Sequence, residues 1–152
     1  MIQQNIRDVA KAAVAIMQAE GHPLDFSLDS LEMIDDRIEQ FRQEGETADS
    51  MPATMTGMGI YVGEVLLRTL GRGEWVEDRN LGPWPSLKIG DIVANPIGKC
   101  MKRLDSGKAD SVRAFAEALV AMAAKSVEEI LTYVASNPGW KVTKAKEQMC
   151  SR

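Results

Sequence analysis

Few side chains in this sequence are of the types that perform nucleophilic or metal-dependent chemistry. The chain has one histidine, His22, and two cysteines, Cys100 and Cys150. A nucleophile needs a neighbouring base and an orienting group, and a zinc site needs clustered ligands. His22 has no cysteine nearby, which indicates a loop or capping role, and Cys100 falls in an apolar helical pattern typical of a packed, unreactive thiol. The sequence therefore predicts no catalytic residue, no metal ligand and no cofactor.

Three closely spaced glycines, Gly57, Gly59 and Gly63, have the composition of a phosphate-binding loop but not its context. No strand precedes them, and their G-x-G-x-x-x-G spacing differs from the dinucleotide fingerprint. A glycine inside a helix costs about 0.5–1 kcal/mol relative to alanine. Close approach of another backbone would offset that cost, so we expect these glycines to serve helix packing.

Acidic residues are concentrated in one segment. The whole chain carries a net charge of −4. Residues 25–49 include nine acidic and two basic side chains, a net of −7, which leaves +3 for the rest. Within this segment an apolar helical stripe forces Asp35, Asp36 and Glu39 to face elsewhere. They are interpreted either as a solvated face or as a docking face that attracts a basic partner.

Trp84 lies between two prolines in a turn-rich loop. An exposed aromatic side chain on a rigid loop is a typical interface anchor. A role in capping the small sheet fits the sequence equally well.

Basic residues cluster in and just after the fourth predicted helix and in the C-terminal tail. Such residues at helical spacing can bind phosphates, but no known nucleic-acid-reading motif accompanies them and the acidic segment opposes a general footprint. Nucleic-acid binding is therefore only a further alternative. The basic residues are Lys99, Lys102, Arg103, Lys108, Lys141, Lys144 and Lys146.

Hydrophobic periodicity predicts about five helices and three short strands. In the first helix the residues that recur at helical spacing are Ile2, Ile6, Val9, Ala13, Ile16 and Met17. The expected helices are 2–20, 29–44, 54–70, 96–105 and 111–134, the last with a bend near Ser126, and the expected strands are 74–78, 86–89 and 91–94. A Gly90-Asp91 turn makes the strands an antiparallel meander. The predicted fold is α+β and mostly α, with one domain over residues 1–140 and a basic, frayed tail over 141–152.

Charged residues interrupt the first twenty positions, so no signal peptide is expected. No apolar run approaches the roughly 18–20 residues that a membrane helix needs. The two cysteines are too far apart in the sequence to suggest a disulfide framework. We expect a cytoplasmic protein without membrane contact.

From Tyr61 to Leu119 the order of motifs resembles an uncharacterised bacterial domain family. The shared features are a helix with a Gly-Glu pair, Leu-Gly before a Trp-Val strand, a short hairpin, and a Pro-started helix that ends in Lys-Arg. The matching positions are Gly63-Glu64, Leu70-Gly71, Trp75-Val76, Pro96 and Lys102-Arg103, and the match covers about two-fifths of the chain. The inserted Arg72-Gly73 departs from the tightest form of the pattern.

The resembled family carries no established activity. Small acidic proteins of this kind are similar to the immunity partners of secreted bacterial toxins. The resemblance also places Glu64 near the hairpin, where it could pair with Lys102 or Arg103, either as a structural charge cluster or as a ligand site.

Three functions follow from these patterns. The first is a non-enzymatic immunity protein that occludes a toxin domain with a basic surface, with Asp35, Asp36, Glu39 and Trp84 as contacts. The second is a small enzyme or anion-binding protein with a site between the third helix and the sheet, using Glu64, Lys102 and Arg103. The third is a nucleic-acid-associated regulator.

Overall fold

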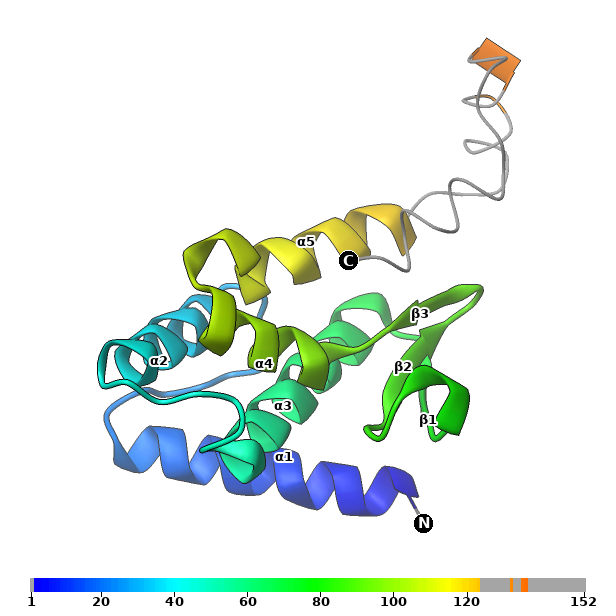
Figure 1. Ribbon diagram of the computed structural model, residues 1–152. Coiled ribbons are helices and arrows are strands. Elements are labelled where there is room, and N and C mark those ends of the chain that lie inside the picture. The colour runs from blue at the N-terminus through cyan, green and yellow to red at the C-terminus, as the bar shows by residue number, and fades with distance from the viewer. Residues whose placement is uncertain (1, 124–131, 133–134, 137–152) are drawn as a thin grey trace.

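The computed structural model describes residues 2–123, 132, 135 and 136, and within this part the protein is α+β and mostly helical, as the sequence predicts (Figure 1). The helices are α1 (Ile2–Ala19), α2 (Leu31–Gln43), α3 (Pro52–Leu70), α4 (Pro96–Ser106) and α5 (Val112–Ala123). The strands are β1 (Glu74–Val76), β2 (Ser86–Ile89) and β3 (Ile92–Ala94), and two 3-10 turns span Arg79–Leu81 and Lys108–Asp110.

Helix α3 is the centre of the fold. It packs against α1, α4 and α5, while α2 packs against α4 and α5 (Figure 1). An unbroken run from Met58 to Leu66 is buried. A helix that is buried on all sides over two turns needs apolar or small residues at nearly every position of those turns. Between Met58 and Leu66, Glu64 is the only charged residue of α3.

Two of the three glycines in α3 allow close packing, as expected. A Cβ on Gly59 would overlap the backbone of Ile97 at the start of α4. A Cβ on Gly63 would overlap the ring of Trp75 on β1. Gly57 differs, because a Cβ there would meet only the side chain of Ala13 at an ordinary 3.9 Å.

The sheet is the predicted antiparallel meander in the order β1-β2-β3. Trp75 pairs with Leu87, and Leu87 pairs with Ala94 on its other side. All three side chains are buried, so one face of the sheet contributes to the core. The turn between β2 and β3 uses Gly90 with φ of +60°, a conformation that glycine adopts without strain.

Helix α5 begins at Val112 and is described as far as Ala123. Its predicted continuation to residue 134, the bend near Ser126 and the tail over 141–152 lie outside the described residues. Over the part of the chain that the structure describes, no helix combines the length and apolarity required to cross a membrane.

Candidate functional site

A buried ion-pair network joins α2 to α4. Asp35 and Glu39 are one helical turn apart and therefore share a face of α2. The guanidinium of Arg103 donates from Nη1 to Glu39 Oε1 at 3.0 Å and from Nε to Asp35 Oδ1 at 3.3 Å. The Arg103 side chain is only 4% exposed. Each buried charge in this network therefore has an opposite charge beside it.

The same Asp35 carboxylate caps the start of α5. Its Oδ1 accepts from the backbone N–H of Val112 at 2.8 Å. Its Oδ2 accepts from the backbone N–H of Arg113 and from Ser111 Oγ, each at 3.0 Å. The first N–H groups of a helix have no partner within it, and a negative charge there is favourable. One side chain thus connects three helices.

The expectation that Asp35, Asp36 and Glu39 form one outward acidic face is wrong for two of them. The carboxylates of Asp35 and Glu39 bind Arg103 and the start of α5, which lie against that side of α2, although both residues border the same pocket as Asp36. Asp36 is exposed, and within the described residues its carboxylate has no ion pair. Contact between Asp36 and a partner stays a prediction.

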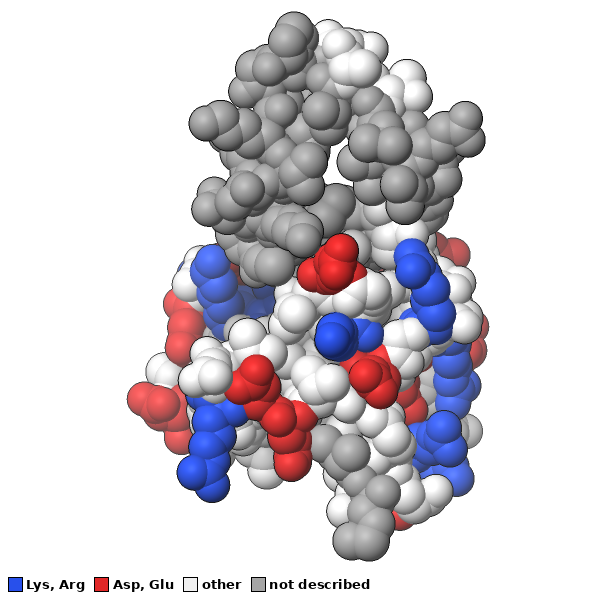
Figure 2. All heavy atoms as spheres, turned by 90° about the vertical axis from the view of Figure 1, so that its right-hand side faces the viewer, with Lys and Arg blue, Asp and Glu red and all other residues white. Residues whose placement is uncertain are grey.

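Arg113 neutralises more of the acidic segment. Its guanidinium binds Asp29 at 2.8 Å and Glu32 at 2.7 Å, two acids from the start of α2 and the loop before it. Arg103 and Arg113 thus bring two positive charges from α4 and α5 against the net −7 of this segment. Figure 2 shows acidic and basic side chains interspersed on the sheet side of the molecule as well.

Trp84 is half-buried and packs against the hydrophobic core. This placement agrees with the capping alternative. Contact between its remaining exposed surface and a partner stays a prediction.

The predicted pairing of Glu64 with Lys102 or Arg103 is wrong. Glu64, which is 8% exposed, accepts a hydrogen bond from Trp75 Nε1 at 3.3 Å. Arg103 pairs with Glu39 on α2. The Lys102 side chain is 62% exposed, and its Nζ lies 3.5 Å from Asp110 Oδ1. The pairing fails because Glu64 lies against Trp75 on β1, whereas Arg103 lies against α2 and Lys102 against Asp110.

Glu64, Gly63 and Trp75 instead form one packing unit. Gly63 leaves room for the indole ring, and the next residue receives the indole N–H. This unit explains physically why a Gly-Glu pair and a tryptophan strand occur together in this sequence.

Cys100 is buried, and two bases of α4 are held in ion pairs. Burial, followed by the nearby Asp35 charge, raises the pKa of the Cys100 thiol far above its ordinary range, so it stays protonated. Among the residues described, no group of three His, Cys, Asp or Glu side chains could hold a metal ion. The α4 bases Lys99 and Lys102 both pair with Asp110.

An apolar groove of about 280 Å³ lies between α1, the end of α2 and the start of α3. Val9 and Ile16 line it and are 39% and 61% exposed. Helix α1 buries Ile6, Ala10 and Met17 instead. Val9 and Ile16 are seven residues apart and lie about 90° around the helix from the Ile6–Met17 face, which is the face that α3 covers.

Comparison with models of known protein families, with curated proteins and with solved structures finds no match to this chain.

Proposed function

We propose that this protein is a non-enzymatic protein-binding module and that the groove beside α1 is its docking surface. The observation that carries the proposal is the joint exposure of Val9 and Ile16 at one groove. Single exposed hydrophobic residues are normal on protein surfaces, whereas contiguous ones that line a concavity are typical of interaction sites.

The composition of the groove fits an apolar helix or loop of a partner. Ala12, Ala13 and Gly57 are small residues that permit close approach of another backbone. The rim is polar, since Glu20 lines the groove and accepts from Arg37 Nε at 2.9 Å. An apolar centre within a polar rim is the usual anatomy of a protein interface.

The proposal extends to an immunity role in the bacterial cytoplasm, with a secreted toxin as the partner. The support for this step is the family resemblance. Asp36 and the exposed part of Trp84 remain the contacts proposed outside the groove. Inhibition by occlusion needs only buried anchors and matched charge, with no reaction.

The test uses the purified product of the adjacent gene and isothermal titration calorimetry. Ile16→Glu should weaken binding by about tenfold to a hundredfold, because it places a charge in an apolar interface. Leu81→Glu is the matched control, since Leu81 is 40% exposed but lies outside the groove. The proposal is overturned if the neighbour does not bind, or if both variants bind as the parent does.

A further inference from the structure

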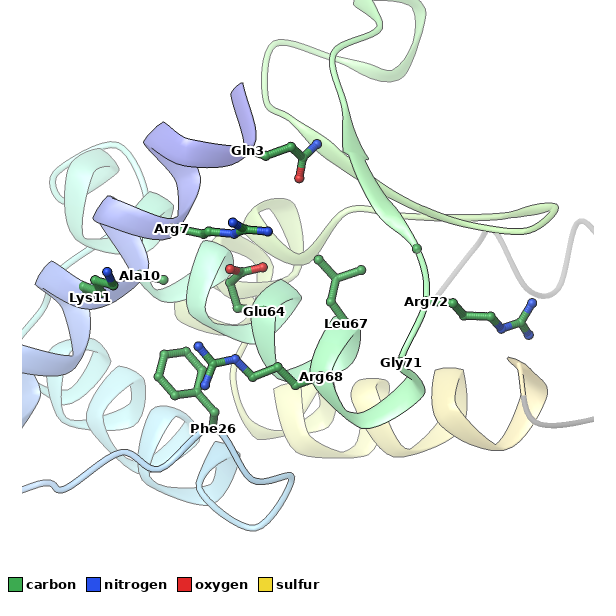
Figure 3. A pocket seen from close by; sticks show the side chains of 11 residues that line it. Gln3, Arg7, Ala10, Lys11, Phe26, Glu64, Leu67, Arg68, Gly71 and Arg72 are labelled. Atoms are coloured by element: carbon green, nitrogen blue, oxygen red, sulfur yellow. The ribbon is translucent and has the colours of Figure 1, made fainter. Parts of the chain in front are cut away.

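The opposite edge of α1 borders a second cleft, of about 420 Å³, between α1, α3 and the turn that leads into β1 (Figure 3). Helix α1 contributes Gln3, Arg7 and Lys11, which recur every four residues and therefore share one edge of the helix. Helix α3 contributes Glu64 and Arg68, again four residues apart. Two polar rows thus face each other across the cleft.

Cations dominate this cleft. Arg7, Lys11 and Arg68 supply three positive charges and Glu64 one negative charge, a net of +2. Within the described residues, the side chains of Arg7 and Lys11 have no ion-pair partner. Arg72 also borders the cleft, but its guanidinium points away and donates to the Ala123 carbonyl at 2.6 Å (Figure 3).

Glu64 forms the acidic part of the cleft wall. Its Oε2 is occupied by the Trp75 indole. Its Oε1 has no hydrogen-bond partner among the described residues. Every fully buried side-chain polar atom in this part of the chain has a partner, so Oε1 must be open to solvent. A nearly buried carboxylate with one free oxygen is favourable only when a donor can reach it.

Phe26 fixes the position of one cation. The Arg68 guanidinium lies 3.5 Å from the centroid of the Phe26 ring, and Figure 3 shows the two stacked at the cleft wall. Phe26 adopts φ of +62°, a conformation that costs a non-glycine residue about 1–3 kcal/mol. The hydrogen bond from its backbone N–H to Tyr61 Oη at 2.9 Å helps to hold it there.

We infer that this cleft binds a small phosphate monoester that also carries a hydroxyl group, such as a sugar phosphate. Arg7, Lys11 and Arg68 would bind the phosphate, because a dianion is best matched by several cations. Glu64 Oε1 would accept from the ligand hydroxyl. The cleft lies within the roughly 300–1,000 Å³ that ligand pockets occupy. This site is independent of the protein-docking groove, which lies on the other edge of α1.

The test is calorimetry and thermal-shift measurement with ribose 5-phosphate, inorganic phosphate and ribose as probes. Ribose 5-phosphate should bind more tightly than inorganic phosphate, and ribose alone should not bind. Arg68→Gln and Lys11→Gln should each weaken binding of both phosphates by about tenfold to a hundredfold, the loss expected for one charged hydrogen bond. Arg79→Gln, an exposed arginine outside the cleft, should leave both affinities unchanged.

Glu64→Gln tests the contact with the ligand hydroxyl separately from the contacts with the phosphate. Without the carboxylate, inorganic phosphate should bind more tightly because repulsion is removed. The preference for ribose 5-phosphate over inorganic phosphate should shrink because the hydroxyl acceptor is weaker. The inference is overturned if neither phosphate binds at millimolar concentration, if Arg68→Gln and Lys11→Gln bind as the parent does, or if a crystal structure shows Arg7 closed onto Glu64 in the presence of ribose 5-phosphate.

Discussion

Two regions of this molecule combine acidic and basic side chains, and they use them in opposite ways. At the α2–α4–α5 junction, Arg103 is matched by Asp35 and Glu39, and Asp35 also caps α5. In the cleft beside α1, three cations and Glu64 lie near one another without an ion pair between them. Matched charges hold helices together, whereas cations without an ion-pair partner are available to a ligand.

Replacing Arg103 with methionine should have the largest effect on the first region. The change leaves buried acidic side chains without their cation, and breaking such a pair costs about 3–5 kcal/mol of unfolding free energy. Urea denaturation followed by circular dichroism measures this loss. Lys102→Met is the control, since that exposed ammonium should contribute less than about 1 kcal/mol. Equal losses in the two variants would contradict the role given to Arg103.

Asp35→Asn should have the next largest effect. The variant loses the charge that binds both the start of α5 and Arg103, at a cost of about 1.5–3 kcal/mol. Asp36→Asn, one residue along the same helix, should stay within about 0.5 kcal/mol because Asp36 is exposed. If the two variants lose similar stability in the same urea titration, α5 does not depend on Asp35.

Acid should weaken the same junction through Glu39. The hydrogen bond from Arg103 lowers the pKa of Glu39 below its ordinary value of 4.5, although burial acts against this. Because the folded-state pKa is the lower one, the ionised carboxylate stabilises the fold above pH 4.5, and this contribution is lost as pH falls through the lowered pKa.

Urea midpoints measured from about pH 7 to about pH 3 test this expectation. In Glu39→Gln the stability should be lower at neutral pH and should fall less steeply in acid than in the parent protein. An unchanged pH profile would show that Glu39 does not titrate with folding.

Glu64→Gln should have the smallest effect on stability, within about 1 kcal/mol in either direction. The amide oxygen can still accept the Trp75 N–H, and no cation loses an ion-pair partner. Thermal and urea unfolding measure this change. A loss as large as that of Asp35→Asn would mean that the cleft charges stabilise the fold, and the contrast between the two regions would fail.

Over the described residues, the sequence alone determined the order and approximate positions of the helices and strands, because these depend on local periodicity and on turn residues. Asn95-Pro96 starts α4, with Asn95 Oδ1 accepting from the Gly98 N–H at 3.0 Å, and Gly90 turns the hairpin. The packing role of Gly59 and Gly63 was also predictable, since a glycine inside a helix needs a compensating contact.

Only the tertiary structure decided which charges meet and which edges of α1 remain open. Arg103 lies 64 and 68 residues from Glu39 and Asp35 in the sequence, so helical spacing cannot reveal that they pair. The buried face of α1 is likewise set by where α3 lies, and this leaves Val9 and Ile16 exposed at one edge and Arg7 and Lys11 at the other. Periodicity fixes the faces of a helix, but the neighbours that cover each face come from distant parts of the chain.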